Sequence, residues 1–217
     1  MGKPLPNGGL GRNISTTSST QKKLSCSKDL VIWGENLPST VGTGRFTKKE
    51  REMIKLPSFQ YSVIVGLLLS DGWLRLSKKS KSLNAHLGLQ QSIDHVDYIW
   101  YVFNLLSHYC NNLPVYRWQK RGEKYNLSIE VITRALPCFT KLHSIFYPNG
   151  VKIIPNNIYN ILTPIALAHL IMGDGSVSRH GLVLCTDSYS IEDVVRLINV
   201  LIIRYRLECS LRYPTPT

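Results

Sequence analysis

Two short stretches of the sequence each carry an apolar run to an aspartate and stop it with a glycine. The first is VGLLLSDGW, with Asp71 and Gly72, and the second is AHLIMGDGS, with Asp174 and Gly175. Glycine is the usual residue just beyond a helix C-terminus, so one such pair needs only a helix end to explain it. Two copies need more, because an anion at the negative end of a helix dipole costs roughly 0.3–1 kcal/mol.

A divalent cation would remove the electrostatic cost of both aspartates. If the two helices pack side by side, Asp71 and Asp174 approach each other, and like charges at close range cannot both stay ionised cheaply. Carboxylates and the carbonyls of helix ends are hard oxygen ligands that suit Mg²⁺. We therefore predict a magnesium site formed by Asp71, Asp174 and the backbone at Gly72 and Gly175.

Close packing of the two apolar runs requires small side chains at the contact. Gly66 and Ser70 offer them in the first run, and Ala168 and Gly173 in the second. We predict that these four residues form a helix interface.

The elements around the two motifs are repeated. Residues 59–69 are almost uniformly apolar and predict a buried helix with Ser58 as its N-cap, and Thr163 and Pro164 predict the start of a second helix. Residues 73–92 and 114–132 predict two strand pairs, and residues 95–109 and 135–147 predict helices. The sequence LVLCTDSYSIEDVVRLINVLI aligns without a gap with LGLQQSIDHVDYIWYVFNLLS, which indicates an internal duplication.

The charge of the chain favours a polyanionic partner. Lysine and arginine total 26 against 14 acidic residues in 217, for a net charge of +12. Such a balance is typical of proteins that bind DNA, RNA or an acidic surface. No apolar run approaches the roughly 18 residues of a membrane span, so no membrane association is predicted. The five cysteines are scattered without a CxxC pair, which argues against a zinc site.

Composition divides the chain into four segments. Residues 1–29 are basic and rich in Gly, Ser and Thr, which predicts a disordered tail and is also compatible with a transit peptide. Residues 30–56 mix apolar anchors with turn formers and predict a lead-in segment. Residues 57–160 and 161–217 hold the first and second copies of the repeat.

The paired motifs resemble those of the LAGLIDADG homing endonucleases, with IVGLLLSDG at residues 64–72 and LAHLIMGDG at residues 167–175. The lead-in also resembles the intron-encoded enzymes of fungal mitochondria. The resemblance implies an α+β fold of two αββαββα halves related by a pseudo-two-fold axis. Because the sequence stops soon after its second motif, we expect the second half, 161–217, to be truncated; a complete chain of this kind would be a monomer.

The resemblance implies a site-specific double-strand DNA endonuclease encoded by a group I intron. It would hydrolyse phosphodiester bonds with Mg²⁺ in a long asymmetric target, for intron homing, and its location would be mitochondrial. The alternatives are an RNA maturase that assists splicing of its own intron RNA, an inactive DNA-binding remnant, or an unrelated basic transcription factor.

The family pattern also implies catalytic residues beside the two aspartates. Gln91 is the candidate glutamine, because Gln90 should point to the opposite face of its strand, and Thr186 is its counterpart in the second half. Lys152 is the candidate lysine that polarises water or steadies the phosphate, although it could equally be a solvated loop residue.

Basic residues on the predicted hairpins are the expected DNA contacts, since two-stranded ribbons fit the major groove. They are Arg75, Lys78, Lys79 and Lys81 on the first hairpin, Arg117, Lys120, Arg121 and Lys124 on the second, and Arg179 and Arg212 in the second half.

Overall fold

A computed structural model describes residues 37–76, 83–122, 124–179 and 181–212. All of them belong to one compact unit. In chain order its elements are α1 (Lys48–Met53), α2 (Ser58–Leu69), β1 (Trp73–Leu76), β2 (Ala85–Ser92), the 3₁₀ turn η1 (Ile93–His95), α3 (Val96–Leu106), the 3₁₀ turn η2 (Ser107–Tyr109), β3 (Val115–Arg121), β4 (Lys124–Ile132), α4 (Pro137–Phe146), α5 (Ile158–Ile161), α6 (Pro164–Asp174), β5 (Gly175–Ser178), β6 (Gly181–Leu184) and α7 (Ile191–Tyr205).

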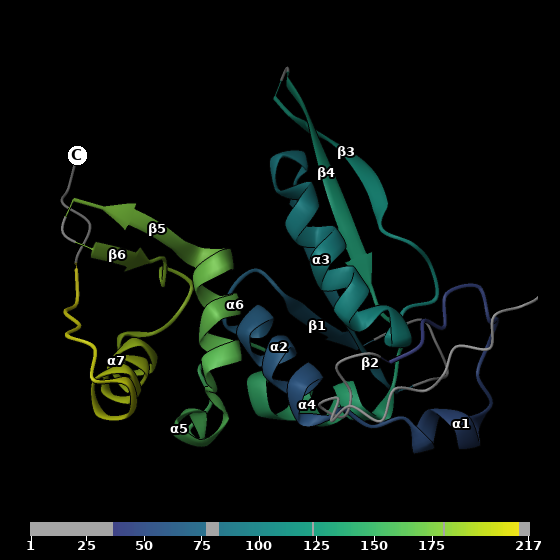
Figure 1. The fold of residues 1–217 in the computed structure, drawn as a ribbon, viewed down its shortest axis with the longest axis horizontal. Coiled ribbons are helices and arrows are strands. Elements are labelled where there is room, and N and C mark those ends of the chain that lie inside the picture. The colour runs from purple at the N-terminus through teal and green to yellow at the C-terminus, as the bar shows by residue number, and fades with distance from the viewer. Residues whose placement is uncertain (1–36, 77–82, 123, 180, 213–217) are drawn as a thin grey trace, which may run out of the picture. The chain divides into compact units, whose positions relative to one another are not determined.

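The first half is a four-stranded antiparallel sheet with helices on one face. Its strand order is β1-β2-β4-β3. α3 packs on β2 and β4, and α4 packs on β1 and β2 (Figure 1). Leu74 of β1 pairs with Leu87 of β2, and Leu89 of β2 pairs with Val131 of β4. All four side chains are buried, so this parity marks the helix-facing side of the sheet.

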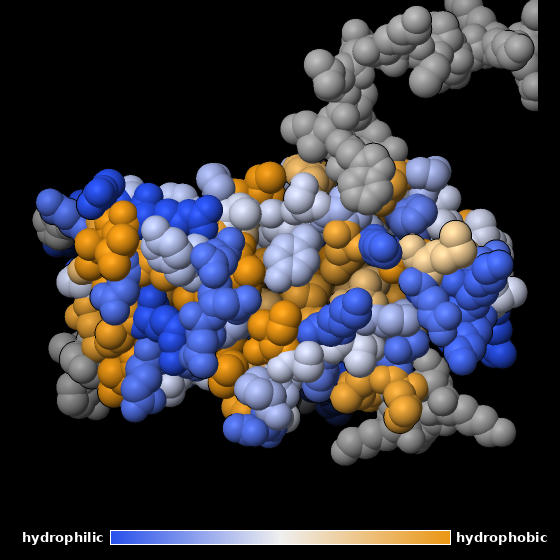
Figure 2. Space-filling model, turned by 90° about the horizontal axis from the view of Figure 1, so that it is seen from below, coloured by the Kyte–Doolittle hydropathy of each residue, from blue (hydrophilic) through white to orange (hydrophobic). Residues whose placement is uncertain are grey.

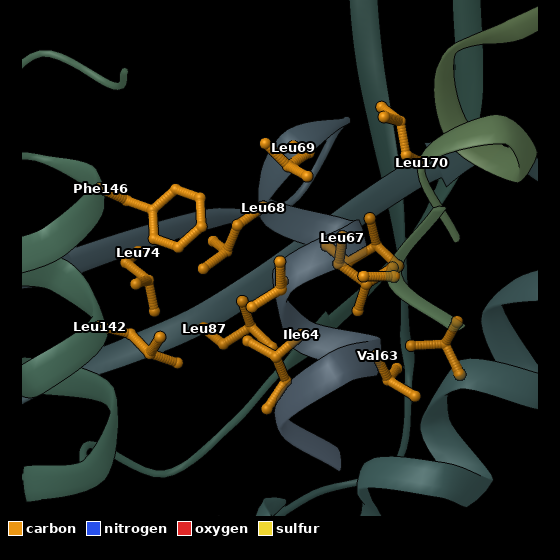
Figure 3. Close-up of a cluster of buried hydrophobic side chains, with 14 of the residues drawn as sticks. Val63, Ile64, Leu67, Leu68, Leu69, Leu74, Leu87, Leu142, Phe146 and Leu170 are labelled. Carbon is orange, nitrogen blue, oxygen red and sulfur yellow. The ribbon is translucent and has the colours of Figure 1, made fainter. Parts of the chain in front are cut away.

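α2 lies inside the core, as its uniformly apolar sequence predicts. Val63, Ile64, Leu67 and Leu68 have no exposed surface. Figure 3 shows side chains of α2 facing Leu74, Leu87 and the α4 residues Leu142 and Phe146. Because α2 is apolar on all sides, it can be stable only where other elements cover every face.

The starts of the two motif helices test the capping predictions. In α6, the Thr163 side chain accepts a hydrogen bond from the Ala166 N–H and Pro164 is the first helical residue, which confirms the prediction. In α2 the helix begins one residue earlier than predicted. Pro57 is the N-cap, and Ser58 is already helical, with no side-chain cap. Proline fits there because its fixed φ is compatible with an extended N-cap residue.

The second copy repeats the order helix, hairpin, helix. α6 is followed by the antiparallel pair β5–β6 and then by α7, as α2 is followed by β1, β2 and α3. Val96 starts α3 and Ile191 starts α7, which are aligned residues of the repeat. Within the described residues β6 pairs with β5 alone, and apolar side chains of α7 are exposed at its end of the molecule (Figure 2).

The lead-in segment is held against the first half by Arg134. Its guanidinium donates hydrogen bonds to the carbonyls of Gly44 and Thr40, and it lies 4.1 Å from the centre of the Phe46 ring. The segment also contains α1, which the sequence interpretation missed. Thr47 and Glu50 cap each other's backbone there in a capping box, a pattern that is readable in the sequence TKKE. Among the described residues, no helix has the length and apolarity that a membrane crossing requires.

Candidate active site

α2 and α6 lie side by side, in more extensive contact than any other pair of helices in the described part of the chain (Figure 1). A methyl group added to Gly66 would collide with the carbonyl oxygen of Ala166 and would lie 2.6 Å from Cβ of His169. A methyl group on Gly173 would collide with the hydroxyl of Ser70. The two helix backbones therefore approach because four of the contact residues, Gly66, Ser70, Ala166 and Gly173, are small.

One predicted member of this interface is wrong. Ala168 is exposed, whereas Ala166, His169 and Leu170 are buried. With Gly173, the buried residues fall at helical positions i, i+3, i+4 and i+7, which share one face of α6. Ala168 lies two residues beyond Ala166, about 200° around the helix, and so points away from α2.

His169 fills the space that Gly66 leaves. Its side chain is only 2% exposed, its Nδ1 lies 2.9 Å from the hydroxyl of Tyr98, and its ring stacks on Tyr101. Burial lowers the pKa of His169 to about 4, so the ring is neutral at pH 7. The histidine thus ties α6 to α3, and the glycine opposite it makes room for the His169 Cβ.

Asp71 follows the last turn of α2, where its carboxylate meets the second half. Its Oδ2 accepts a hydrogen bond of 2.5 Å from Gln91 Nε2. The same oxygen lies 3.6 Å from the position of a Cβ on Gly173. Gln91 reaches Asp71 because it continues the helix-facing parity of Leu87 and Leu89. Gln90 instead donates to the Ser128 hydroxyl on the other face.

Asp174 is the last residue of α6 and is half-buried. Burial, followed by the negative charge of Asp71, raises its pKa to about 6, while Lys152 acts in the opposite direction. Its carbonyl oxygen accepts a hydrogen bond of 2.9 Å from the Cys185 N–H. The two aspartates therefore lie close enough for the charge of one to oppose ionisation of the other.

Lys152 reaches the same place from the loop after α4. Its Nζ donates hydrogen bonds to the carbonyls of Ser70 at 2.5 Å and Gly72 at 2.9 Å. Burial lowers the pKa of Lys152 to about 8, against the attraction of Asp174 and Asp71. The ammonium group therefore sits at the negative end of the α2 dipole and near both carboxylates.

The segment that carries Lys152 is held by the second half. Asp193 of α7 accepts a hydrogen bond of 3.2 Å from the Ile154 N–H, and Arg196 donates to the Ile154 carbonyl at 2.6 Å. Asp193 and Arg196 also form an ion pair, so both backbone groups of Ile154 are bound by one partly buried ion pair. The position of Lys152 thus depends on contacts between the two halves.

Tyr189 is a site residue that the sequence interpretation missed. Its hydroxyl donates to the carbonyls of Leu69 at 3.1 Å and Leu68 at 3.3 Å, and Lys152 Nζ lies 6.0 Å from its ring centre. A tyrosine of the second half therefore caps the motif helix of the first. A tyrosine in a loop between a hairpin and a helix carries no pattern that could have predicted this contact.

Comparison with known proteins places this arrangement in a family. The profile of the LAGLIDADG DNA endonuclease family matches residues 61–217. The chain belongs to the LAGLIDADG DNA endonuclease family. A solved LAGLIDADG structure, the homing endonuclease I-WcaI bound to its DNA recognition sequence, is similar with a TM-score of 0.71 and 25% identity over 85% of this chain and 84% of that one. The α+β fold of two LAGLIDADG copies is thereby confirmed.

Curated LAGLIDADG relatives carry two kinds of name. The cytochrome b mRNA maturase bI2 of Saccharomyces cerevisiae is 31% identical over 69% of this chain, and that of Debaryomyces hansenii is 28% identical over 75%. The probable intron-encoded endonuclease 1 of Wickerhamomyces canadensis is 28% identical over 89% of this chain and 83% of its own length. The chain spans 37% and 60% of the lengths of the two maturases.

The LAGLIDADG aspartates fit a divalent cation. They supply two carboxylates at adjoining helix ends, where the charge of Asp71 helps to raise the pKa of Asp174, and oxygen donors are the ligands that such ions favour. In the described part of the chain no cluster of three or more His, Cys, Asp or Glu side chains comes together. Backbone, water or phosphate oxygens would therefore complete the coordination. The Gly72 carbonyl, a predicted ligand, already accepts the Lys152 ammonium, whereas Gly175 begins β5 directly after Asp174.

The LAGLIDADG sheet carries some of the predicted DNA contacts on its open face. Arg75 pairs with His86, and Arg117 pairs with Ser128 and bonds Glu130; all have the parity opposite to the buried residues. Arg121 and Lys124 are register partners next to the turn at Gly122. Arg179 follows β5 and Arg212 follows α7, and both are exposed. Lys78, Lys79 and Lys81 lie outside the described residues.

Lys120 does not share the face of Arg117. It pairs with Tyr125 and so has the parity of the helix-facing side, where its Nζ lies 5.9 Å from the centre of the Tyr125 ring. The prediction named Lys120 together with Arg117 among the expected DNA contacts of this hairpin. The pleat separates Lys120 from Arg117, because side chains an odd number of residues apart point to opposite faces.

Proposed function

We propose that the protein is a site-specific double-strand DNA endonuclease encoded by a group I intron and that it acts in intron homing. The observation that carries the proposal is the meeting of Asp71 and Asp174, one from each copy of the repeat, with Lys152 close to both. A catalytic acid from each half suits a substrate with two antiparallel strands, because each strand then meets an equivalent group.

The chemistry we propose is hydrolysis of a phosphodiester bond, with Mg²⁺ held by Asp71 and Asp174. A divalent cation held there would lower the pKa of a water molecule bound to it and would neutralise charge on the phosphate oxygens. Gln91 fixes the Asp71 carboxylate in one orientation through its 2.5 Å hydrogen bond. Lys152, with a pKa of about 8, is mostly protonated at pH 7 and balances the two carboxylates and the incoming phosphate.

Double-stranded DNA is the proposed partner of the open sheet face. The net charge of +12 and the exposed arginines Arg75 and Arg117 support it. Arginine can bond guanine edges in the major groove and can also bind phosphate. The I-WcaI structure, which contains its DNA recognition sequence, supports the same partner. The names of the cytochrome b maturases support an organelle setting, and we propose a mitochondrial location.

The test is cleavage of DNA that spans the intron insertion site. The purified chain with Mg²⁺ should cut the intronless sequence into fragments with cohesive ends and should leave the intron-interrupted sequence intact. Asp71→Asn should abolish the cut while the variant still binds the target in a gel-shift assay. Cleavage that survives in Asp71→Asn would exclude the proposed chemistry.

A second function, RNA maturase activity, is favoured by the two relatives named cytochrome b mRNA maturase. Splicing of the host intron transcript in vitro, with and without the protein, tests it. If the maturase activity is separate from DNA cleavage, Asp71→Asn should stimulate splicing as well as the unchanged protein does. If splicing shows no dependence on the protein, this second function is wrong.

A further inference from the structure

Three aromatic side chains stand exposed on the β3–β4 hairpin. Trp118 is 70% exposed, Tyr125 is 64% exposed and Tyr116 is 52% exposed. Single exposed apolar residues are common, but a large aromatic row on one surface is informative because aromatic rings dominate interface energetics. We call Tyr116, Trp118, Lys120 and Tyr125 the aromatic row.

The aromatic row lies on the side of the sheet opposite to Arg117. Tyr116 pairs with Ile129 and Trp118 pairs with Leu127. Ile129 is fully buried beneath the helices, and Leu127 lies two residues before it on the same face of β4. Tyr116 and Trp118, which pair with these two residues, therefore point to the helix-facing side of the sheet. α3 packs against β2 and β4, whereas β3 is the outer strand of the sheet (Figure 1). The rings on β3 are exposed because the helix layer stops one strand short.

The spacing of the row suits a chain of unpaired bases. Alternate residues of a strand lie about 6.6–6.8 Å apart, so Tyr116 and Trp118 present two rings in line on the same face. Tyr125 lies diagonally across from Trp118, and Lys120 rests beside the Tyr125 ring at 5.9 Å. Rings that stack on bases, next to a cation that can meet the backbone, are how sheets bind single-stranded nucleic acid.

We propose that the aromatic row is a binding surface for unpaired nucleotides of RNA. Bases of a DNA duplex are stacked on each other and cannot lie on these rings, whereas loops and bulges of a folded RNA offer free base faces. The positive charge of the chain and the cation within the row favour a polyanion over an apolar protein segment. The row and the DNA face would then bind different nucleic acids on opposite sides of one hairpin.

The proposal does not depend on DNA cleavage, because it concerns binding at another surface. The experiment uses the full chain and a labelled unstructured RNA of about 12 nucleotides, with fluorescence anisotropy as the readout. The Trp118→Ala, Tyr125→Ala variant should lose about 10-fold or more in RNA affinity, since two stacked bases are lost. Trp118→Phe, Tyr125→Phe should retain most of the affinity, because the rings remain.

Four controls test whether a loss of RNA affinity comes from the aromatic row itself. Tyr159→Ala removes an exposed tyrosine of α5, 49% exposed, and should leave RNA affinity unchanged. Arg117→Ala should weaken binding of duplex DNA and spare RNA. A DNA oligonucleotide of the same sequence distinguishes the sources of unpaired bases. Thermal unfolding of each variant verifies that it is folded.

The proposal stands if the double alanine variant weakens RNA binding while its affinity for duplex DNA stays within about twofold. It is overturned if the variant weakens RNA and duplex DNA equally, or if it weakens neither. Binding of the DNA oligonucleotide as tight as that of the RNA would overturn the assignment to RNA. A dimer of the unchanged chain that dissociates on Trp118→Ala would overturn it too, because a second copy would then cover the row.

Discussion

The hydrogen bond from Gln91 to Asp71 gives the site a sharp residue-level prediction. Gln91→Leu leaves one carboxylate oxygen free to rotate out of place. Loss of such a supporting hydrogen bond commonly costs about 10–100-fold, so we expect kcat for DNA cleavage to fall by about that factor with little change in target affinity.

The neighbouring Gln90 supplies the control. It bonds Ser128 on the other face of β2, so Gln90→Leu should retain kcat. Single-turnover cleavage at saturating protein, together with a gel-shift measurement of affinity, separates the two effects. Equal loss of kcat in both variants would show that the loss comes from a general disturbance of β2 and not from the missing hydrogen bond to Asp71.

His169 predicts how stability changes with pH. Its pKa is lowered by burial from 6.5 to about 4, so between these values the unfolded chain binds a proton that the folded chain does not. Stability therefore falls as the pH drops from 6.5 to 4, by about 3 kcal/mol in all for this group. Urea unfolding at a series of pH values should show this loss as the difference in unfolding free energy between the unchanged protein and His169→Gln.

Asp174 titrates in the same pH range as His169, so the His169 contribution must be measured against the His169→Gln variant. Its pKa is raised from 3.8 to about 6, so it binds a proton on folding in this range and opposes the trend of His169. Subtraction of the His169→Gln profile removes the Asp174 contribution, because both proteins contain it. A difference profile that is flat from pH 4 to 6.5 would contradict the lowered pKa of His169.

At the residue scale, the two aspartates Asp71 and Asp174 could be named from the sequence because they belong to a duplicated pattern. Gln91 was named from the family resemblance, and strand parity separated it from Gln90. Tyr189 and Asp193 could not be named, since they act through contacts of the second half with α2 and with the Lys152 loop. A pairwise contact between distant loops leaves no periodicity in the sequence.

The contact between α2 and α6 predicts which small residues are needed for stability. In Gly66→Ala the added methyl meets the backbone carbonyl of Ala166, which cannot rotate away. We expect a loss of about 1–3 kcal/mol of unfolding free energy, as for overpacked cores.

Ala168→Leu is the matched control, at a residue of α6 that points away from α2. Its site is exposed on α6, so a larger side chain should change stability by no more than about 0.5 kcal/mol. Chemical denaturation of the two variants compares them directly. If Ala168→Leu were the more destabilising, the contact face of α6 would have to be turned toward Ala168.

Helices and hairpins were predictable at the element scale, because the apolar pattern changes period where one gives way to the other. The face of α6 was not. Ala168 and Ala166 are both small, and only the packing of α2 decides which of them is buried. Similarly, basic residues on one hairpin look alike in sequence, but the register divides Lys120 from Arg117.

For the whole molecule, a cation held by Asp71 and Asp174 should link the two halves. Mg²⁺ should raise the melting temperature of the unchanged chain, by an amount that corresponds to about 2.7 kcal/mol at about 100 times Kd. Asp174→Asn and Asp71→Asn should respond much less. In EDTA, Asp174→Asn should be at least as stable as the unchanged protein, because it removes a carboxylate that burial and Asp71 disfavour.

Differential scanning fluorimetry with and without EDTA measures this response, and Ca²⁺ in place of Mg²⁺ tests whether a hard cation suffices. The same Mg²⁺ shift in all three proteins would mean that the ion binds elsewhere.

The contact between α2 and α6 is asymmetric, because Gly66 of α2 faces His169 of α6. This asymmetry determines how the two copies can pair. Two α6 helices brought together would set one His169 ring against another, and two α2 helices would leave an empty space between their glycines. Each motif helix is therefore shaped for the other and not for itself. Halves produced as two separate polypeptides should consequently recombine one to one, and neither should substitute for its counterpart in a symmetric pair.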